Sequence, residues 1–549
     1  MSAAYLAGRT DMVAGTPNMV EAAGKAPVMR SVETVLFLVV VATVVATFAR
    51  RLRVPAPSLL VVAGVVLGLL PGVPRIQVTP DLVSLVVLPP LLYAAGAELP
   101  WRDLRAVWRP VSALAVGLVL ASAAVVGAVV VAITDLPIGL ALVLGTVLAS
   151  TDPVAVTALG RRLSLPPRVQ VLIQAESLFN DATSLLLFRI AISLAIATGG
   201  LSVGHTIGEF LLLAGGGTLI GALVAGGVIL IRRRTVDPVL ETVISLVTPY
   251  TAYVLAEAVH SSGVTAVVLC SVVVGTRTDG LTNARIRLQL TAVTDTVVFL
   301  LESVVFGLIG LELPTLIREL ASTDNAWPLQ ALGITGALIV IRILWVFPLS
   351  AVLQRRRGSR RPSWQVPAVV SWAGARGVVP LAAALSIPLT TQDGTPLPHR
   401  DLVLLLASAV IVITLVVQGF TLAPLVKRAG IAVAPADIEQ EVGLAQRRLT
   451  NAGLAHLDQL AGLEAAAEPI LEQLRDRLRA RLARLGHPDD DQPDSAATAA
   501  QYRTLRRDLL AVQSLELARL YEAGQITDAT RRRLQRDLDL EDAGLGESG

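Results

Sequence analysis

Two apolar segments between residues 150 and 181 carry oxygen-bearing side chains that could bind a small cation. These side chains belong to Thr151, Asp152, Glu176, Ser177, Asn180 and Asp181. Further ionisable residues within apolar runs are Arg189, Glu302, Arg342 and Arg376. An unpaired charge at the centre of a membrane-spanning helix costs roughly 2.5–3.5 kcal/mol, so the set would cost roughly 20 kcal/mol. That exceeds the stability of an ordinary protein, about 5–15 kcal/mol, and these groups must be paired, hydrated or bound to a ligand.

The second segment places its polar residues on one face of a helix. At about 100° per residue, the stripe from Glu176 through Asn180 to Asp181 is about 140° wide. Ser177 and Asp181 are four residues apart, so a hydroxyl and a carboxylate can hold one ion from adjacent turns. Oxygen ligands without His or Cys suit hard cations. The alternative is a hydrogen-bonded seam between helices, which would not need two carboxylates.

Pro153 predicts a break in the first segment. Proline removes a backbone donor and disfavours helix at the preceding residue. The break would free carbonyl groups, such as that of Thr151, to bind a cation, and Asp152 could compensate the partial charge of a helix end. Interrupted helices at mid-membrane depth are typical of ion sites. The alternative is a plain proline kink with Asp152 as an N-cap.

A second interruption is predicted around Arg376, which lies between Gly374 and Gly377. Arg376 would be a fixed positive partner there, or part of an ion pair that never contacts a bound ion. Glu302 could line a funnel or stabilise the core. We expect Arg189 and Arg342 to be structural or to reach the membrane interface.

Composition indicates a polytopic membrane protein. The mean hydropathy is +0.66, with 53% hydrophobic and 16% charged residues. The single cysteine, Cys270, excludes intrachain disulfides and thiolate metal sites. The net charge of +3 gives no indication of nucleic-acid binding. The sequence contains no phosphate-binding loop motif and predicts no cofactor.

Thirteen apolar runs approach the length of a spanning helix, about 20 residues. They cover residues 32–49, 57–72, 80–97, 110–134, 137–159, 168–198, 206–231, 238–259, 261–276, 291–313, 328–353, 365–389 and 400–426. Short loops after odd-numbered runs are rich in arginine, whereas those after even-numbered runs carry only Arg75, Arg318 and Arg400. The positive-inside rule therefore predicts an external N-terminus and a cytoplasmic C-terminus.

The chain is expected to have three parts: an extracellular segment 1–31, a transmembrane domain 32–428 and a cytosolic helical tail 429–549. In the tail, helical periodicity over 436–485 and 498–540 flanks an acidic, proline-marked linker at 487–494. The charged faces of the tail predict ordinary solvated surface, or a regulatory or dimer-stabilising role.

Three motifs resemble the cation:proton antiporter-1 family, the bacterial and eukaryotic sodium/proton exchangers. They are Thr151-Asp152-Pro153, the Glu-Ser-Leu-Phe-Asn-Asp run over 176–181, and Gly374-Ala375-Arg376-Gly377, in that family's order and on matching helices. The end of the tenth run, Gly-Leu-Glu-Leu over 310–313, is also similar. The resemblance covers roughly residues 32–428.

The resemblance implies an all-α homodimer in the cell membrane. Each protomer would have dimerisation and core subdomains, inverted repeats, and two crossed, partly unwound helices. The resemblance also implies a role for each site residue. Asp181 would bind the cation and the proton in turn, the Ser177 hydroxyl and the Thr151 carbonyl would bind the cation, and Glu176 would hold a water that binds the cation. Asp152 would balance the charges of the crossing helices, while Asn180, Arg376 and Glu302 would stabilise the core.

The implied activity is sodium/proton exchange serving pH homeostasis. Electrogenic relatives carry two adjacent aspartates where this chain has Asn180 and Asp181, so the resemblance predicts electroneutral 1:1 exchange of Na⁺, and also Li⁺, for H⁺. The same machine could select K⁺. A more distant alternative is an intramembrane aspartyl protease using Asp152 and Asp181, although its Tyr-Asp and Gly-x-Gly-Asp motifs are absent. A passive channel is a further alternative. The expected partners are these ions and membrane lipid.

Overall fold

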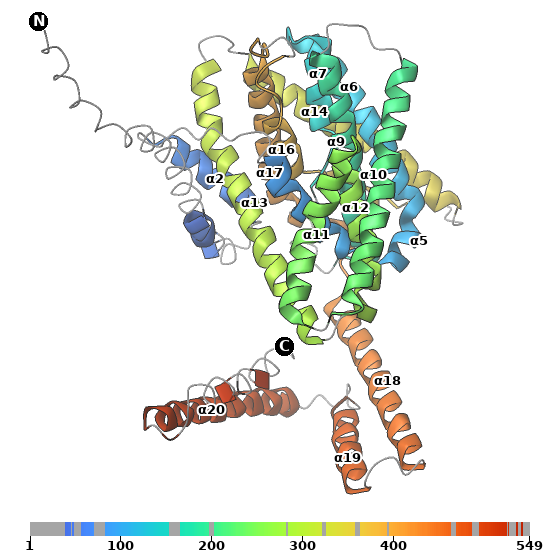
Figure 1. Cartoon of the computed structure of the whole chain (residues 1–549), viewed down its shortest axis with the longest axis vertical. Coiled ribbons are helices and arrows are strands. Elements are labelled where there is room, and N and C mark those ends of the chain that lie inside the picture. The colour runs from blue at the N-terminus through green and yellow to red at the C-terminus, as the bar shows by residue number, and fades with distance from the viewer. Residues whose placement is uncertain are drawn as a thin grey trace, which may run out of the picture. The chain divides into compact units, whose positions relative to one another are not determined.

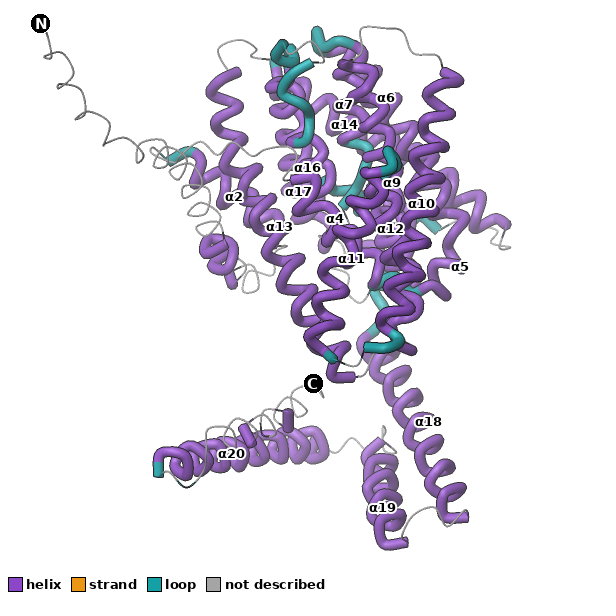
Figure 2. The backbone as a smooth tube through the Cα atoms, viewed as in Figure 1, coloured by secondary structure: helices purple, strands orange, loops and turns teal. Residues whose placement is uncertain are grey.

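The computed structural model is almost entirely helical in the residues that it describes (Figure 2). These are residues 39–45, 47–48, 56–70, 83–152, 165–196, 203–235, 237–281, 284–320, 326–356, 363–391, 395–462, 468–485, 493–523 and isolated positions between 525 and 541. No strand occurs among them, and the one isolated bridge joins Thr390 to Pro396. The expectation of an all-α chain is confirmed.

Seven helices are long and apolar enough to cross a membrane. These spans are Trp101–Ile133, Pro167–Ile196, Gly208–Arg232, Pro238–Ala258, Ile286–Arg318, Trp327–Arg355 and Arg400–Ala429, and they are joined by the shorter apolar helices Ser58–Gly68, Leu85–Ala97, Ile138–Val147 and Gly263–Arg277. Each coincides with one of the apolar runs of the sequence. The chain is therefore built to pass through a membrane several times.

By their mutual contacts, the helices of the apolar region form two groups. Figure 1 labels most of these helices. The first group contains α5 (Trp101–Ser112), α6 (Val119–Ile133), α7 (Ile138–Val147), α9 (Pro167–Ile196), α14 (Trp327–Arg356), α15 (Gln365–Trp372), α16 (Val378–Leu385) and α17 (Arg400–Ala429). The second group contains α2 (Ala56–Gly68), α4 (Leu88–Ala97), α10 (Val203–Arg232), α11 (Pro238–Ala258), α12 (Gly263–Leu281) and α13 (Ala284–Leu320). Most helix contacts stay within one group, and α9, α16 and α17 also touch the other group.

In the second group, α2 and α13 approach so closely that glycines are required. A Cβ atom on Gly64 would lie 2.8 Å from the Gly307 carbonyl oxygen and from the Gly310 Cα atom. Small residues let the backbones of two membrane helices come into contact. Lipid is as apolar as the side chains and gives no hydrophobic driving force, so close van der Waals packing holds such a pair together. The pair gives the second group a tightly packed edge.

The long helix of the first group contains a π-helical turn, η2 (Ala113–Leu118), between α5 and α6. Such turns widen the backbone and free a carbonyl group from the regular ladder. Here the Ala113 carbonyl accepts a hydrogen bond from the Trp345 indole at 3.2 Å. The long helix is thereby tied to α14.

Two of the predicted apolar runs in the first group contain non-helical residues. The α7 helix ends at Val147 and residues 149–152 are not helical, while residues 153–164 lie outside the described part. The predicted run 365–389 is divided into α15 and α16 by residues 373–377. The end of α7 lies before Pro153, and the division between α15 and α16 contains Gly374 and Gly377, as expected for breaks at these positions.

The chain divides into two compact units, Met1–Val433 and Ala434–Gly549. The second unit contains α18 (Pro435–Gly462), α19 (Glu468–Leu485) and α20 (Pro493–Glu522). Of the predicted linker at 487–494, residues 487–492 lie outside the described part of the chain. Its last two residues, 493 and 494, belong to α20. Arg475 of α19 forms ion pairs with Asp458 of α18 and with Glu468 of its own helix. The pair with Asp458 links α18 to α19.

Candidate functional site

The two interrupted segments meet at Asp152. Its backbone N–H donates to the Ala375 carbonyl at 2.8 Å, and its carboxylate accepts the Val378 N–H at 3.0 Å. Val378 is the first residue of α16, whose N-terminus carries a partial positive charge and unsatisfied N–H groups. Asp152 therefore compensates a helix end in the middle of the bundle, as the sequence predicted for one of its roles.

Gly377 makes this contact possible. A Cβ atom at position 377 would collide with the Asp152 carboxylate. The glycine before the helix is thus a requirement of close approach between the two segments, because any side chain there would push the carboxylate off the α16 N-terminus.

Thr151 is held against α9 by two side chains. The Ser177 hydroxyl donates to the Thr151 carbonyl at 2.5 Å, and the Asn180 amide donates to the Thr151 hydroxyl at 2.7 Å. The Asn180 amide oxygen accepts the Thr151 N–H at 3.4 Å. Ser177 and the Thr151 carbonyl, which the resemblance assigned to one cation, are therefore in contact, and Asn180 holds the non-helical backbone through both the hydroxyl and the N–H of Thr151.

Asp181 lies one turn beyond Ser177 and is buried, with a relative exposure of 5%. Its Oδ1 atom and the Ser150 hydroxyl have no partner at hydrogen-bonding geometry among the described residues, although the two side chains are close enough to interact. The groups facing Asp181 are the carboxylate of Asp152, the hydroxyl of Ser150 and the guanidinium of Arg376. A buried carboxylate oxygen without a donor is costly, so this position calls for a proton or a cation.

A cavity of about 370 Å³ leads to this carboxylate. From the first helix group it is lined by Asp152, Ser177 and Asp181, and from the second group by Glu98 at the end of α4 and by Asp295 and Glu302 of α13. Carboxylates line both walls, which favours the entry of cations. Glu302 therefore borders the cavity, one of the two positions that its sequence context allowed.

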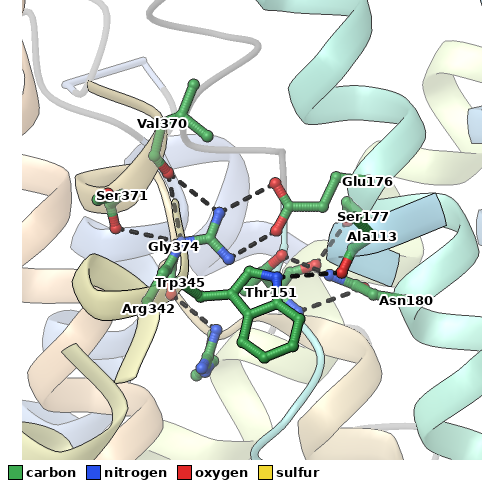
Figure 3. A network of polar contacts seen from close by, with 11 residues as sticks. Ala113, Thr151, Glu176, Ser177, Asn180, Arg342, Trp345, Val370, Ser371 and Gly374 are labelled. Carbon is green, nitrogen blue, oxygen red and sulfur yellow. Dashed lines mark hydrogen bonds and ion pairs between the residues drawn. The ribbon is translucent and has the colours of Figure 1, made fainter. Parts of the chain in front are cut away.

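A buried ion pair stands behind the cavity wall (Figure 3). Both Glu176 oxygens accept from Arg342, at 2.6 and 3.0 Å, and the two side chains are 1% and 4% exposed. Arg342 also donates to the carbonyls of Val370 and Ser371, at 3.1 Å each. It thereby serves as a positive cap at the C-terminal end of α15, where carbonyl groups lack helical partners.

Arg376 lies within the second interruption and is buried. Its guanidinium donates to the Gly374 carbonyl at 3.0 Å and faces Arg342, Glu176 and Asp181. Its backbone N–H donates to the hydroxyl of Thr414 on α17 at 3.3 Å. Arg376 is therefore close to the carboxylates of Glu176 and Asp181.

One ion pair joins the two helix groups away from the cavity. Arg189 of α9 binds Glu257 of α11, and the same Glu257 oxygen accepts the Gly263 N–H at the start of α12. Both side chains are about one-third exposed. Arg189 is therefore a structural residue, one of the alternatives open from the sequence.

Two residues of this region were not included in the predicted site: Ser150 had no stated role, and Arg342 was expected to be structural or to reach the membrane interface. Ser150 directly precedes Thr151, and it could have been included among the candidate site residues because it lies beside the predicted helix break. Arg342 required a buried partner by its charge alone, but Glu176 is 166 residues away in the chain and no spacing rule identifies it. Among the described residues no cluster of three or more His, Cys, Asp or Glu side chains could hold a metal ion.

Comparison with known proteins identifies the family. Residues 38–428 match the model of the sodium/hydrogen exchanger, transmembrane domain. An uncharacterized Na⁺/H⁺ exchanger of Mycobacterium tuberculosis is 34% identical over 93% of this chain and 96% of its own length. The Na⁺/H⁺ antiporter ApNhaP of Aphanothece halophytica is 32% identical over 80% of this chain and 83% of its own.

Further matches extend the comparison. A sodium, potassium, lithium and rubidium/H⁺ antiporter of Bacillus pumilus is 30% identical over 74% of this chain and 62% of its own length. The structure of the sodium proton antiporter MjNhaP1 from Methanocaldococcus jannaschii at pH 8 superposes with a TM-score of 0.59 at 19% identity, over 73% of this chain and 99% of that one, and so shares the fold. This multi-pass membrane chain belongs to the sodium/hydrogen exchanger family and is a transporter, not an enzyme.

Proposed function

We propose that this chain exchanges cytoplasmic Na⁺, and also Li⁺, for external H⁺ at a ratio of one to one. The observation that carries the proposal is the buried Asp181 carboxylate with an unpartnered oxygen at the cavity that separates the two helix groups. Its environment supplies oxygen atoms and no nitrogen or sulfur ligands, which suits a hard monovalent cation.

The mechanism is competition between the two ions for Asp181. When Asp181 is ionised it binds the cation, assisted by the Ser177 hydroxyl and the Thr151 carbonyl, whose oxygens lie 2.5 Å apart. When it is protonated the cation leaves. The first helix group then moves against the second and exposes Asp181 to the opposite side of the membrane, so that only an occupied site crosses.

The two carboxylates nearest to Asp181 along the motifs, those of Glu176 and Asp152, are already engaged, which supports electroneutral exchange. Glu176 is bound twice by Arg342, and Asp152 accepts the Val378 N–H. Glu176 retains lone pairs through which it can hold a water on the cation. Asn180 is a neutral amide bound to Thr151, so Asp181 alone exchanges its ion and no net charge crosses in a cycle.

The ion preference is Na⁺ in this proposal, with K⁺ as the second candidate. One relative is described by its name as a Na⁺/H⁺ antiporter, whereas the Bacillus pumilus relative carries potassium and rubidium in its name as well. Selection among these ions depends on sub-ångström differences in the cavity. Exchange assays with each ion separate the two candidates.

The proposed topology has thirteen spans in the cell membrane. The seven long and four short apolar helices account for eleven of them, the pair α15–α16 for another, and the helical residues near 39–48 for the last. The end of α7 in the fifth predicted span and the division of the twelfth between α15 and α16 support an arrangement with inverted repeats. Arginine-rich loops support an external N-terminus, a cytosolic tail and a cytoplasmic opening of the cavity between α4 and α13.

The second helix group would form the contact between protomers of a homodimer. Its α2–α13 pair is packed backbone to backbone at Gly64 and Gly310, which suits a fixed support for a moving partner. Cross-linking of purified protein in the membrane tests this assembly.

The test of function is exchange by purified protein in liposomes loaded with a pH-sensitive dye. Na⁺, Li⁺ and K⁺ are added in turn, and the membrane voltage is clamped at zero. Wild type should release the trapped protons, Asp181→Asn should not, and Asp135→Asn, an exposed aspartate between α6 and α7, should match the wild type. Exchange by Asp181→Asn at the wild-type rate would overturn the shared-site mechanism.

A further inference from the structure

A second large cavity lies between the two helix groups, away from the ion site. It has a volume of about 460 Å³ and is bounded by α5 and α9 of the first group and by α10 and α12 of the second. Volumes of roughly 300–1,000 Å³ are usual for sites that hold a small molecule. None of the ion-site residues lines it.

The interior of this crevice is apolar. Its walls include Leu104 of α5, Phe179 and Leu186 of α9, Phe210 of α10, and Leu269 and Val272 of α12. Side chains of this kind offer dispersion contacts to a hydrocarbon and no fixed hydrogen-bond direction.

The hydroxyl groups in the lining are already used. Ser112 donates to the Trp108 carbonyl, Thr183 to the Phe179 carbonyl and Thr218 to the Ala214 carbonyl, at 2.7–2.9 Å. Thr265 donates to the Ser262 hydroxyl at 3.0 Å. Each hydroxyl proton therefore stays within its own helix region, and the crevice interior presents no spare donor to a polar ligand.

One rim of the crevice has a different chemistry. Trp101, Arg105 and Trp108 of α5 belong to the lining, and the two indoles are 49% and 57% exposed. The Arg105 guanidinium carbon lies 6.0 Å from the centre of the Trp101 ring. Arg105 is exposed and makes no ion pair within the described part of the chain. Tryptophan at the end of a spanning helix marks the membrane interface, where arginine meets lipid phosphate.

We propose that this crevice is a binding site for one anionic phospholipid, whose phosphate contacts Arg105 while one acyl chain lies between α9 and α10. Charge complementarity selects an anionic headgroup, since the rim offers guanidinium and the opposite wall offers no carboxylate. The interior favours a hydrocarbon chain, because its hydroxyl groups already donate to other groups and the rest of its lining is apolar. The lipid would stand on the boundary along which the two groups touch, without taking part in ion binding.

Native mass spectrometry of detergent-purified full-length protein tests the site. Dioleoyl phosphatidylglycerol and dioleoyl phosphatidylcholine are added at equal concentration, and retained adducts are counted. We expect one preferred phosphatidylglycerol adduct on the wild type. Arg105→Gln should reduce its occupancy relative to phosphatidylcholine by about fivefold, the usual worth of one basic residue at an anionic surface. The matched control is Arg102→Gln, on the same helix but outside the lining, which should bind as the wild type does.

Filling the crevice should remove the adduct of either lipid. Ala214→Phe narrows the crevice from the α10 side, and Ala182→Leu narrows it from the α9 side. If one of these two variants fails to fold, the other still provides the test. Equal phosphatidylglycerol retention by Arg105→Gln and Arg102→Gln would overturn the headgroup contact. If a well-folded crevice-filling variant retained the phosphatidylglycerol adduct at the wild-type level, the bound lipid would be ordinary surrounding lipid and the proposed site would be overturned. Ion exchange is not the readout, so failure here leaves the proposed antiport untouched.

Discussion

Replacing Arg342 by methionine should destabilise the transmembrane unit strongly. The substitution leaves Glu176 buried at 1% exposure with neither of its two charged hydrogen bonds. Breaking a buried pair from one side costs about 3–5 kcal/mol, because the remaining charge loses its hydrogen-bonded partner. Arg376 also faces Glu176, but its guanidinium donates to the Gly374 carbonyl instead. The carbonyls of Val370 and Ser371 at the end of α15 lose their donor as well, at roughly 1–3 kcal/mol each.

The double variant Glu176→Met/Arg342→Met separates these two contributions. With both charges gone, only the loss at the α15 carbonyls remains, about 2–6 kcal/mol for two groups. The double variant should therefore be more stable than Arg342→Met alone. Glu176→Met alone should be destabilised by about 3–5 kcal/mol, since it leaves the arginine charge buried.

The assay is thermal unfolding in detergent, followed by tryptophan fluorescence at one fixed scan rate. Arg189→Met is the matched control, because its pair with Glu257 is about one-third exposed and such pairs are worth about 0–1 kcal/mol. The reasoning is refuted if Arg342→Met melts with the control, or if the double variant melts below the single one.

Three further outcomes are expected. Gly377→Ala should lower the unfolding midpoint and abolish exchange, because the added methyl group displaces the Asp152 carboxylate; a variant that melts and transports normally would contradict this. Ser177→Ala should raise the apparent KM for Na⁺ more than it lowers the maximal rate, and the reverse pattern in dye-recovery kinetics would remove Ser177 from the cation ligands. At pH values where Asp181 is mostly protonated, each further unit of acidification should raise the apparent KM about tenfold, as competition requires; a KM independent of pH would exclude a shared site.

Most of the spanning helices could be predicted from hydropathy, and their ends could not. The run 110–134 begins nine residues after the observed helix start at Trp101, because α5 is amphipathic. Its Leu104, Val107 and Val111 form a buried stripe at helical spacing, while its arginines lower the mean hydropathy of the window. Likewise α13 extends from Ala284 to Leu320 beyond the predicted 291–313, with polar ends.

The site divides in the same way between local and distant contacts. Helical spacing predicted that Ser177 and Asp181 share a face, and Pro153 predicted the break beside Asp152. The pairing of Glu176 with Arg342 depends on how α9 and α14 pack, which local spacing does not encode. Residues 153–164, which contain Pro153, lie outside the described part of the chain.

The bond between the two interrupted segments has a mechanical consequence. An unwound stretch in a helix is ordinarily the place where it bends, because it has the fewest backbone bonds to break. Here each stretch is braced by the other, through the two hydrogen bonds of Asp152 and the tight seat at Gly377. Flexing either segment alone would strip a buried carboxylate from its helix end. In the proposed exchange cycle the two segments would therefore move together as one rigid unit, and the displacement would occur along the boundary between the two helix groups.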